Sequence, residues 1–394
     1  MIPRSQLSRT SFTDRGSLMD LSFIQLLWFI LIAILWMGYV ALEGFGFGVG
    51  ILLKGLARNE KERRAALNAI GPHWDGNEVW LITAGGATFA AFPEWYATMF
   101  SGMYLALVVI LVCLIFRICA LEWRKMINSQ RWRNTWDWIN AGASFVVSIL
   151  WGVAFANFVQ GMKIEVGHYE DGVFHAVPVD QVSTSLDAVN KHFLTGGFFS
   201  LLTPFTILGG VMVLLLFISH GALFISIKTA VGDFHNRAQA LAKKTMTAAI
   251  VVVVAWALWA QLSYTNNTAS WIPLGLTAVA FLAAWFFVQK GDEVKAFVAH
   301  FAGLALAVVF IWFTIFPDAM KSSIDPAYSL TLVQASATAP TQTIMTIAAL
   351  VFVPIVLAYT IWAYKVFAKR INVDDIPEQP TGIDYKQIRT FDNV

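Results

Sequence analysis

Two carboxylates stand at the start of an apolar segment, in the sequence GPHWDGNEVW of residues 71–80. Asp75 and Glu78 lead directly into LITAGGATFAAF. A carboxylate at membrane depth is costly unless it is paired or used. Pro72 suits a first helical turn, and the helix dipole favours an acid there by roughly 0.3–1 kcal/mol. Two interpretations follow: Asp75 caps a helix, or Asp75 and Glu78 carry protons.

A third acid, Glu43, lies in YVALEGFGFGVG, near the inner end of the first long apolar run. This depth matches that of Asp75, so we expect the two acids to lie near each other. An acid buried at this depth is a candidate proton relay. Glycines at alternate positions over 44–50 form two GxxxG spacings, which favour close helix packing over a kink.

The composition predicts a membrane protein built from helices. Of 394 residues, 57% are hydrophobic and 13% are charged, whereas soluble domains carry about 25% charged residues. Runs of about 18 apolar residues can each cross a bilayer. We count nine candidate spans: 21–50, 77–92, 95–119, 141–161, 201–227, 247–264, 272–289, 298–316 and 343–367.

Basic residues alternate between the loops. They concentrate after the first, third, fifth and seventh spans and are scarce elsewhere, which places the N-terminus outside and the C-terminus inside. The loops and helix ends that are rich in lysine and arginine hold Lys54, Arg58, Lys61, Arg63, Arg64, Arg117, Arg124, Lys125, Arg131, Arg133, Lys228, Arg237, Lys243, Lys244, Lys290 and Lys295. The alternate loops hold only Lys163, Lys191 and Lys321.

The same reading divides the chain into three parts. We expect a polar N-terminal tail over 1–20, one polytopic membrane domain over 21–370, and a cytoplasmic tail over 371–394. Within the domain, the acidic segment at about 162–200 forms an outer loop.

Other polar residues favour structural roles. Cys113 and Cys119 lie six apart in one apolar run, so neither a disulfide nor a metal pair is expected. Asp137 is interpreted as a helix cap that pairs with Arg133 four residues before it. His220 does not form a convincing pair of haem ligands with any other histidine, so we expect no haem held by this chain.

Several stretches resemble subunit II of the cytochrome bd quinol oxidases. The resemblance covers most of the chain in order, and residues 71–107 are its most specific part. It is carried by GPHWDGNEVWLITAGGATFAAFPEWYATMFSGMYLAL (71–107), EGFGFGVG (43–50), RWRNTWDW (131–138), GVAFANFVQG (152–161), LLTPFTILGGV (201–211) and IFPDAMKSSIDPAYSLTLVQAS (315–336).

The resemblance implies an all-α fold of nine transmembrane helices, in two four-helix bundles with one peripheral helix. It also implies that the protein lies in a bacterial cell membrane and forms a heterodimer with subunit I. A small accessory membrane subunit is a further partner in this family pattern. Subunit I would carry haem b, haem d or a third haem b, and the quinol site. The complex would oxidise quinol, reduce O2 to water and generate a proton-motive force. Some members also hold a structural quinone or lipid.

For individual residues, the resemblance implies a cytoplasmic proton path that includes Asp75. Glu43 and Glu78 are added to this path because of their position in the sequence and their expected depth in the membrane. Trp80 matches a residue at the entrance of an oxygen channel, although a tryptophan here is also a common membrane-interface anchor. Many family members carry a further acid where this chain has Gly46. The alternative function is a proton-coupled transporter of small molecules, since inner carboxylates and glycine-rich helices suit both.

Overall fold

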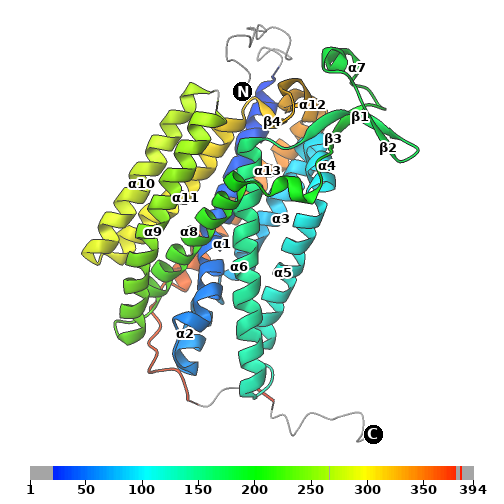
Figure 1. The fold of residues 1–394 in the computed structure, drawn as a ribbon. Coiled ribbons are helices and arrows are strands. Elements are labelled where there is room, and N and C mark those ends of the chain that lie inside the picture. Colours follow the sequence, from blue (N-terminus) through cyan, green and yellow to red (C-terminus); the bar gives the residue numbers. More distant parts are fainter. Residues whose placement is uncertain (1–20, 266, 379–381, 384–394) are drawn as a thin grey trace, which may run out of the picture.

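Long helices run side by side through most of the molecule (Figure 1). The computed structural model describes residues 21–265, 267–378 and 382–383. The predicted tail over 1–20 and much of the tail over 371–394 therefore lie outside the described residues. Eight described helices are long and apolar enough to cross a membrane: α1 (Phe23–Gly55), α5 (Tyr104–Trp123), α6 (Gln130–Gln160), α8 (Pro204–Lys228), α9 (Asp233–Ser263), α10 (Trp271–Lys290, with the preceding η4, Thr268–Ser270), α11 (Glu293–Ile315) and α13 (Ala339–Val366).

The remaining predicted span, 77–92, falls on the 18-residue helix α3 (Trp74–Ala91). This helix is not among the eight because its first two turns carry Asp75, Asn77 and Glu78, which lower its hydropathy.

The span predicted over 95–119 is broken in the structure. Helix α4 (Pro93–Gly102) ends at Met103, whose backbone is not helical, and α5 begins at the next residue. A Cβ on Gly102 would lie 2.3 Å from the Leu194 side chain, so glycine permits this close approach. The hydrophobicity pattern predicted one helix because hydropathy does not register the Ser101-Gly102 pair, a common turn signal, that stands directly before the break.

The helices form two neighbouring groups. Helices α1, α3, α5 and α6 pack together, and α8, α9, α10 and α11 form the second group, joined to the first through α1, α6 and α8. A Cβ on Gly48 would lie 1.9 Å from the Phe217 carbonyl oxygen and 2.8 Å from Gly221 Cα. The close packing predicted for the glycines of α1 is therefore confirmed at Gly48.

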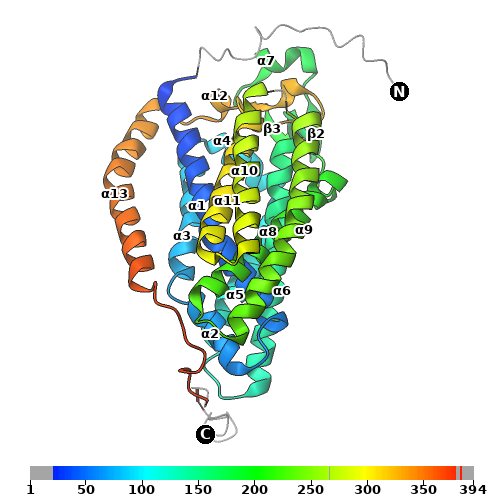
Figure 2. The ribbon, with the colours of Figure 1, turned by 90° about the vertical axis from the view of Figure 1, so that its left-hand side faces the viewer.

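Helix α13 stands at the edge of the molecule (Figure 2). Gln342 is its one buried residue among those described. Gln342 Nε2 donates to the Ala91 carbonyl at 3.0 Å, and Trp28 Nε1 donates to Thr346 Oγ1 at 3.0 Å. These bonds attach α13 to α1 and α3 at the end near the N-terminus of α1.

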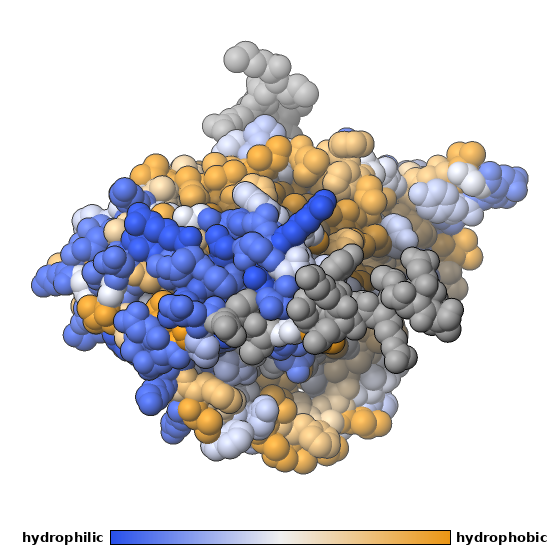
Figure 3. All heavy atoms as spheres, turned by 90° about the horizontal axis from the view of Figure 1, so that it is seen from below, coloured by the Kyte–Doolittle hydropathy of each residue, from blue (hydrophilic) through white to orange (hydrophobic). Residues whose placement is uncertain are grey.

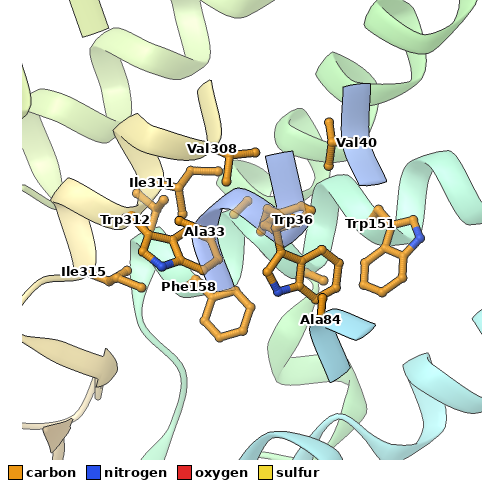
Figure 4. Close-up of a cluster of buried hydrophobic side chains, with 14 of the residues drawn as sticks. Ala33, Trp36, Val40, Ala84, Trp151, Phe158, Val308, Ile311, Trp312 and Ile315 are labelled. Carbon is orange, nitrogen blue, oxygen red and sulfur yellow. The ribbon is translucent and has the colours of Figure 1, made fainter. Parts of the chain in front are cut away.

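Aromatic side chains pack around α1, on the side of α6 and on the side of α11 (Figure 4). Trp36 lies edge-on to Trp151 and Phe155, at ring-centroid distances of 5.1 and 5.2 Å. Trp312 Nε1 donates to the Phe29 carbonyl at 3.1 Å, so this buried indole is satisfied. Such packing fixes α1 between α6 and α11.

Short strands gather at one end of the molecule, which we call the strand face (Figure 1). The first sheet has the order β2-β1-β3 and is antiparallel throughout. The second pairs β4 with β5. The elements are β1 (Ile164–Glu170), β2 (Val173–Ala176), η2 (Val179–Gln181), α7 (Val182–Ser185), β3 (Lys191–Leu194), η3 (Phe198–Leu201), β4 (Asp318–Met320), η5 (Pro326–Tyr328), β5 (Leu330–Thr331) and α12 (Leu332–Ala335).

The opposite end carries α2 (Glu60–Ile70) and hydrophilic residues cover much of it (Figure 3). Residues 371–378, which we call the C-terminal strap, lie across this end. Ile371 pairs with Thr229, Arg64 Nη1 donates to the Pro377 carbonyl at 2.7 Å, and Ile376 is buried. The strap therefore links the helix groups away from the strand face.

Candidate functional site

A buried arginine joins two of the three predicted acids. Arg117 of α5 donates through Nη1 to Glu78 Oε1 of α3 at 2.9 Å, and through Nη2 to Glu43 Oε1 of α1. Arg117 and Glu43 are wholly buried and Glu78 is nearly so. We call these three residues the acid–arginine cluster.

The backbone around Glu43 leaves room for this arrangement. A Cβ on Gly46 would lie 2.4 Å from Glu43 Oε1 and 2.8 Å from Arg117 Nη2, so a larger side chain would displace the ion pair. The guanidinium also lies over the Phe47 ring, 4.6 Å from its centroid. Gly46, where a further acid was expected from the family pattern, thus accommodates the arginine, and Glu78 supplies the second carboxylate.

The charges in the acid–arginine cluster do not balance. Two carboxylates face one guanidinium, and the Glu43 Oε2 atom has no hydrogen-bond partner among the described residues. An uncompensated charge in a buried site is strongly unfavourable. One additional proton would neutralise the cluster, so its geometry suits the uptake and release of a single proton.

Asp75 lies outside this cluster. It is exposed in the first turn of α3, three residues before Glu78, and within the described chain no hydrogen bond or ion pair joins it to another residue. We predicted that Asp75 and Glu43 lie close together, but the structure shows no contact between them. Glu78, and not Asp75, shares the partner Arg117 with Glu43.

Polar side chains continue from the cluster toward α13. Asn77 Nδ2 donates to the Leu42 carbonyl at 2.9 Å, and the Tyr364 hydroxyl donates to Asn77 Oδ1 at 2.9 Å. Tyr364 stacks on His73 with ring centroids 4.1 Å apart. Burial, together with the charge of Lys228, lowers the pKa of His73 to about 4. The loop position suggested a solvated histidine, but His73 is buried and neutral at pH 7.

Trp80 packs against α1. A Cβ on Gly38 would lie 2.0 Å from the Trp80 ring, so the indole occupies the space above this glycine. Its neighbour Leu81 lines an apolar cavity of about 490 Å³ between α3, α5 and α6. Trp36 and Gly85 line the same cavity. Trp80 thus stands beside an apolar space.

A second charged cluster lies at the end that carries α2. Arg124 donates to Asp137 at 2.5 Å and to both carboxylate oxygens of Glu60 at 2.8 Å. Arg133 lies 3.6 Å from Glu60. The predicted pairing of Asp137 with Arg133 is therefore wrong. Ser129 caps α6, and Asp137, two turns further in, faces Arg124 instead.

Two buried histidines meet between α8 and α11. His220 Nε2 donates to the Ala41 carbonyl at 2.9 Å, which leaves His220 Nδ1 to accept from His300 Nδ1 at 3.1 Å. The stacked rings have centroids 4.8 Å apart. Two nitrogens that bind opposite faces of a haem iron lie about 4 Å apart on opposite sides of the porphyrin. The pair therefore does not fit a haem held between the two imidazoles.

Sequence reasoning missed Arg117 and the contact between the histidines. Arg117 was counted only as a basic residue at a helix end, although it interrupts the apolar run LVVILVCLIFRICALEW. An ionisable residue within a membrane span is itself a sign of a function. The histidine pair gives no such sign, because its partners are 80 residues apart in the sequence.

Comparisons with known proteins agree with these features. The model of the family cytochrome bd terminal oxidase subunit II matches residues 24–367. Cytochrome bd ubiquinol oxidase subunit 2 of Bacillus subtilis (strain 168) is 39% identical over 88% of this chain and 96% of its own length. Cytochrome bd-I ubiquinol oxidase subunit 2 of Escherichia coli (strain K12) is 34% identical over 91% and 98%.

The fold is also similar to a solved structure. The structure of bd oxidase from Geobacillus thermodenitrificans has a TM-score of 0.58, with 12% identity, over 87% of this chain and 98% of that one. The family match covers the acid–arginine cluster, the histidine pair and every long helix described above. The chain belongs to the cytochrome bd terminal oxidase subunit II family and is a multi-pass membrane subunit of a respiratory quinol oxidase.

Proposed function

We propose that this chain is the haem-poor subunit of the oxidase and supports a subunit I that carries haem b, haem d and the quinol site. The misfit of the His220–His300 pair to a haem supports this division of labour. The complex oxidises quinol and reduces O2 to water, and the haems supply the electron transfer. That this chain binds a structural quinone or lipid, as some family members do, stays a prediction.

The proposed arrangement in the membrane has nine transmembrane helices, α3 being the additional one. The N-terminus lies outside and the C-terminus inside, so the strand face is external and α2 is cytoplasmic. The loop charges support this orientation, because Lys61, Arg63 and Arg64 lie on α2. Under this proposal the complex is in the inner membrane of a bacterium.

The proton path is proposed to begin at Asp75 and to continue through Glu78 and Glu43. The observation that carries this proposal is the shared arginine: Arg117 holds two carboxylates from different helices in a buried site with one unbalanced negative charge. Asp75 lies one turn before Glu78, exposed at the cytoplasmic end of α3. A proton taken up at Asp75 thus has acceptors further along the same helix.

Asp75→Asn tests the entry step. We expect turnover and proton uptake to fall on the order of 10–100-fold, while the haem spectra of the assembled complex stay unchanged. Asp233→Asn is a matched control, since Asp233 also stands in the first turn of a helix at the same end of the molecule. Normal turnover and charge translocation in Asp75→Asn would remove Asp75 from the path.

The oxygen route is proposed to pass Trp80 and the apolar cavity beside it. A route for O2 needs apolar walls, and the cavity of about 490 Å³ is lined by residues such as Leu81 and Gly85. A Cβ on Gly85 meets nothing within 4 Å, so Gly85→Leu should be tolerated in the fold. We expect a severalfold higher apparent KM for O2 at unchanged kcat. Gly275→Leu on α10, equally free of contacts, is the control; equal O2 affinity in both variants would place the route elsewhere.

A further inference from the structure

The hairpin of β1 and β2 projects sideways from the strand face (Figure 1). Its turn is Asp171-Gly172, and the two residues have positive φ angles of 51° and 79°. A two-residue Asp-Gly turn of this kind matches the twist of a hairpin and fixes the pairing of its strands. The resulting register places His168 of β1 directly opposite His175 of β2. Residues directly opposite each other project from the same face of the sheet, so two imidazoles share one face of the hairpin.

The two imidazoles are close enough to share one metal ion. Their ring centroids lie 5.6 Å apart. Bonds from nitrogen to Zn2+ are about 2.0–2.1 Å long, so two imidazoles on one tetrahedral ion have centroids about 5 Å apart. His168 is half-buried, whereas His175 is exposed and makes no side-chain hydrogen bond within the described part of the chain. A small rotation of the His175 side chain therefore brings a ring nitrogen to an ion held by His168.

Asn190 determines which nitrogen of His168 is available. Asn190 Nδ2 donates to the Ser185 carbonyl at 3.1 Å, and Asn190 Oδ1 lies 2.9 Å from His168 Nδ1. An amide oxygen can only accept, so His168 Nδ1 must carry the proton and donate it. In the neutral imidazole this leaves the lone pair of Nε2 available to a metal. Histidine ligands of metals usually donate their other N–H to a carbonyl or carboxylate oxygen in this way.

Asp187 holds the loop that carries Asn190. Asp187 Oδ1 accepts from the backbone N–H of Val189 at 2.7 Å and from that of Asn190 at 2.8 Å. The N–H groups of Asn190 and Val189, together with the charge of His168, hold the pKa of Asp187 below its usual value. This carboxylate is therefore negative at neutral pH, and a cation at the histidines is attracted to it.

From this geometry we propose that the β1–β2 hairpin binds one divalent transition-metal ion, such as Zn2+, through His168 Nε2 and His175, with Asn190 as the positioning residue. Imidazole suits Zn2+, Ni2+ and Cu2+, whereas Mg2+ and Ca2+ prefer oxygen ligands. Within residues 21–265, 267–378 and 382–383, no third metal-binding side chain joins the pair. Water then completes the coordination, and we expect an exchangeable ion. The proposal rests on neither the proton path nor the oxygen route.

The test measures Zn2+ bound to the intact complex, without a purification tag, by equilibrium dialysis and elemental mass spectrometry. His168→Gln and His175→Gln each remove one ligand. Val173→Gln is the matched control, because it places the same new side chain at an exposed position of the same strand. Asn190→Leu removes the acceptor for His168 Nδ1, and Asn190→Asp keeps one. Haem spectra report assembly, and His175→Gln changes an exposed side chain and so leaves assembly intact.

We expect the unchanged protein and Val173→Gln to bind one more Zn2+ per complex than either histidine variant. Ni2+ should compete for this ion and Mg2+ should not. Asn190→Leu should weaken binding about 10–100-fold, and Asn190→Asp should restore it. No Zn2+ binding, equal binding in all variants, loss of the ion in Val173→Gln, or competition by Mg2+ would each overturn the metal site. Unchanged affinity in Asn190→Leu would overturn the positioning role of Asn190.

Discussion

The buried polar side chains of the two helix groups differ in charge and in hydrogen bonding. Between α1, α3 and α5, Glu43, Glu78 and Arg117 form an unbalanced charged cluster. Between α8 and α11, His220 and His300 form a hydrogen-bonded pair that reaches the same helix α1 at Ala41, two residues before Glu43. At nearly the same level along α1, ionic groups therefore lie on one side of the helix and stacked imidazoles on the other.

Under the proposed proton path, this difference separates groups that would exchange protons from groups that hold helices together. In the histidine pair, His220 has both ring nitrogens bonded and Phe297 stacks on its ring at 4.6 Å; His300 Nε2 has no partner among the described residues, but two neutral imidazoles leave no net charge to compensate. In the acid–arginine cluster, charge neutrality requires one additional proton. We expect substitutions in the first group to change turnover, and substitutions in the second to change stability alone.

The largest effect is expected when the guanidinium is removed. Arg117→Met leaves two buried carboxylates without a cation, and we expect the free energy of unfolding to fall by about 3–5 kcal/mol. Thermal unfolding of the complex, followed through its haem absorbance, measures this loss. Arg117→Met combined with Glu43→Gln and Glu78→Gln should recover most of it. A single variant as stable as the unchanged protein would mean that the acids are not charged in the folded state.

Loss of one acid should act on turnover. Glu43→Gln keeps the size of the side chain and one hydrogen-bond acceptor for Arg117, so assembly should be preserved. We expect quinol oxidase turnover to fall on the order of 100-fold, measured as O2 consumption with excess quinol. Full turnover in Glu43→Gln would move the path away from the cluster.

The histidine pair should show the smallest effect and a different one. His300→Phe removes one hydrogen bond and leaves His220 Nδ1 without a donor, so we expect a loss of about 1–3 kcal/mol in the free energy of unfolding. Turnover per haem and its pH profile should stay unchanged. A shifted pH profile would contradict the contrast between the two groups and assign a protonic role to α8 and α11.

The sequence predicted the helices better than their contacts. Apolar runs located each long helix because membrane spans must be about 20 apolar residues long. The break at Met103 was missed because a hydropathy pattern does not register the Ser101-Gly102 pair before it, and the constraint comes from Leu194 across Gly102. Local composition cannot report a contact of that kind.

The candidate site was predicted in part. The types and depths of Glu43 and Glu78 identified them as candidates, but their common partner Arg117 depends on how three helices are packed. Asp137 illustrates the same limit: spacing favoured Arg133, whereas the fold brings Arg124 to it. The family resemblance supplied the identity of the oxidase, and no packing detail followed from it.

The C-terminal strap and Tyr364 have a consequence for the order in which the chain folds. Tyr364 meets Asn77 across 287 positions of the chain, and Arg64 meets Pro377 across 313. The start of α3 and the neighbouring helix α2 therefore acquire these contacts only after the last long helix of the chain has been synthesised.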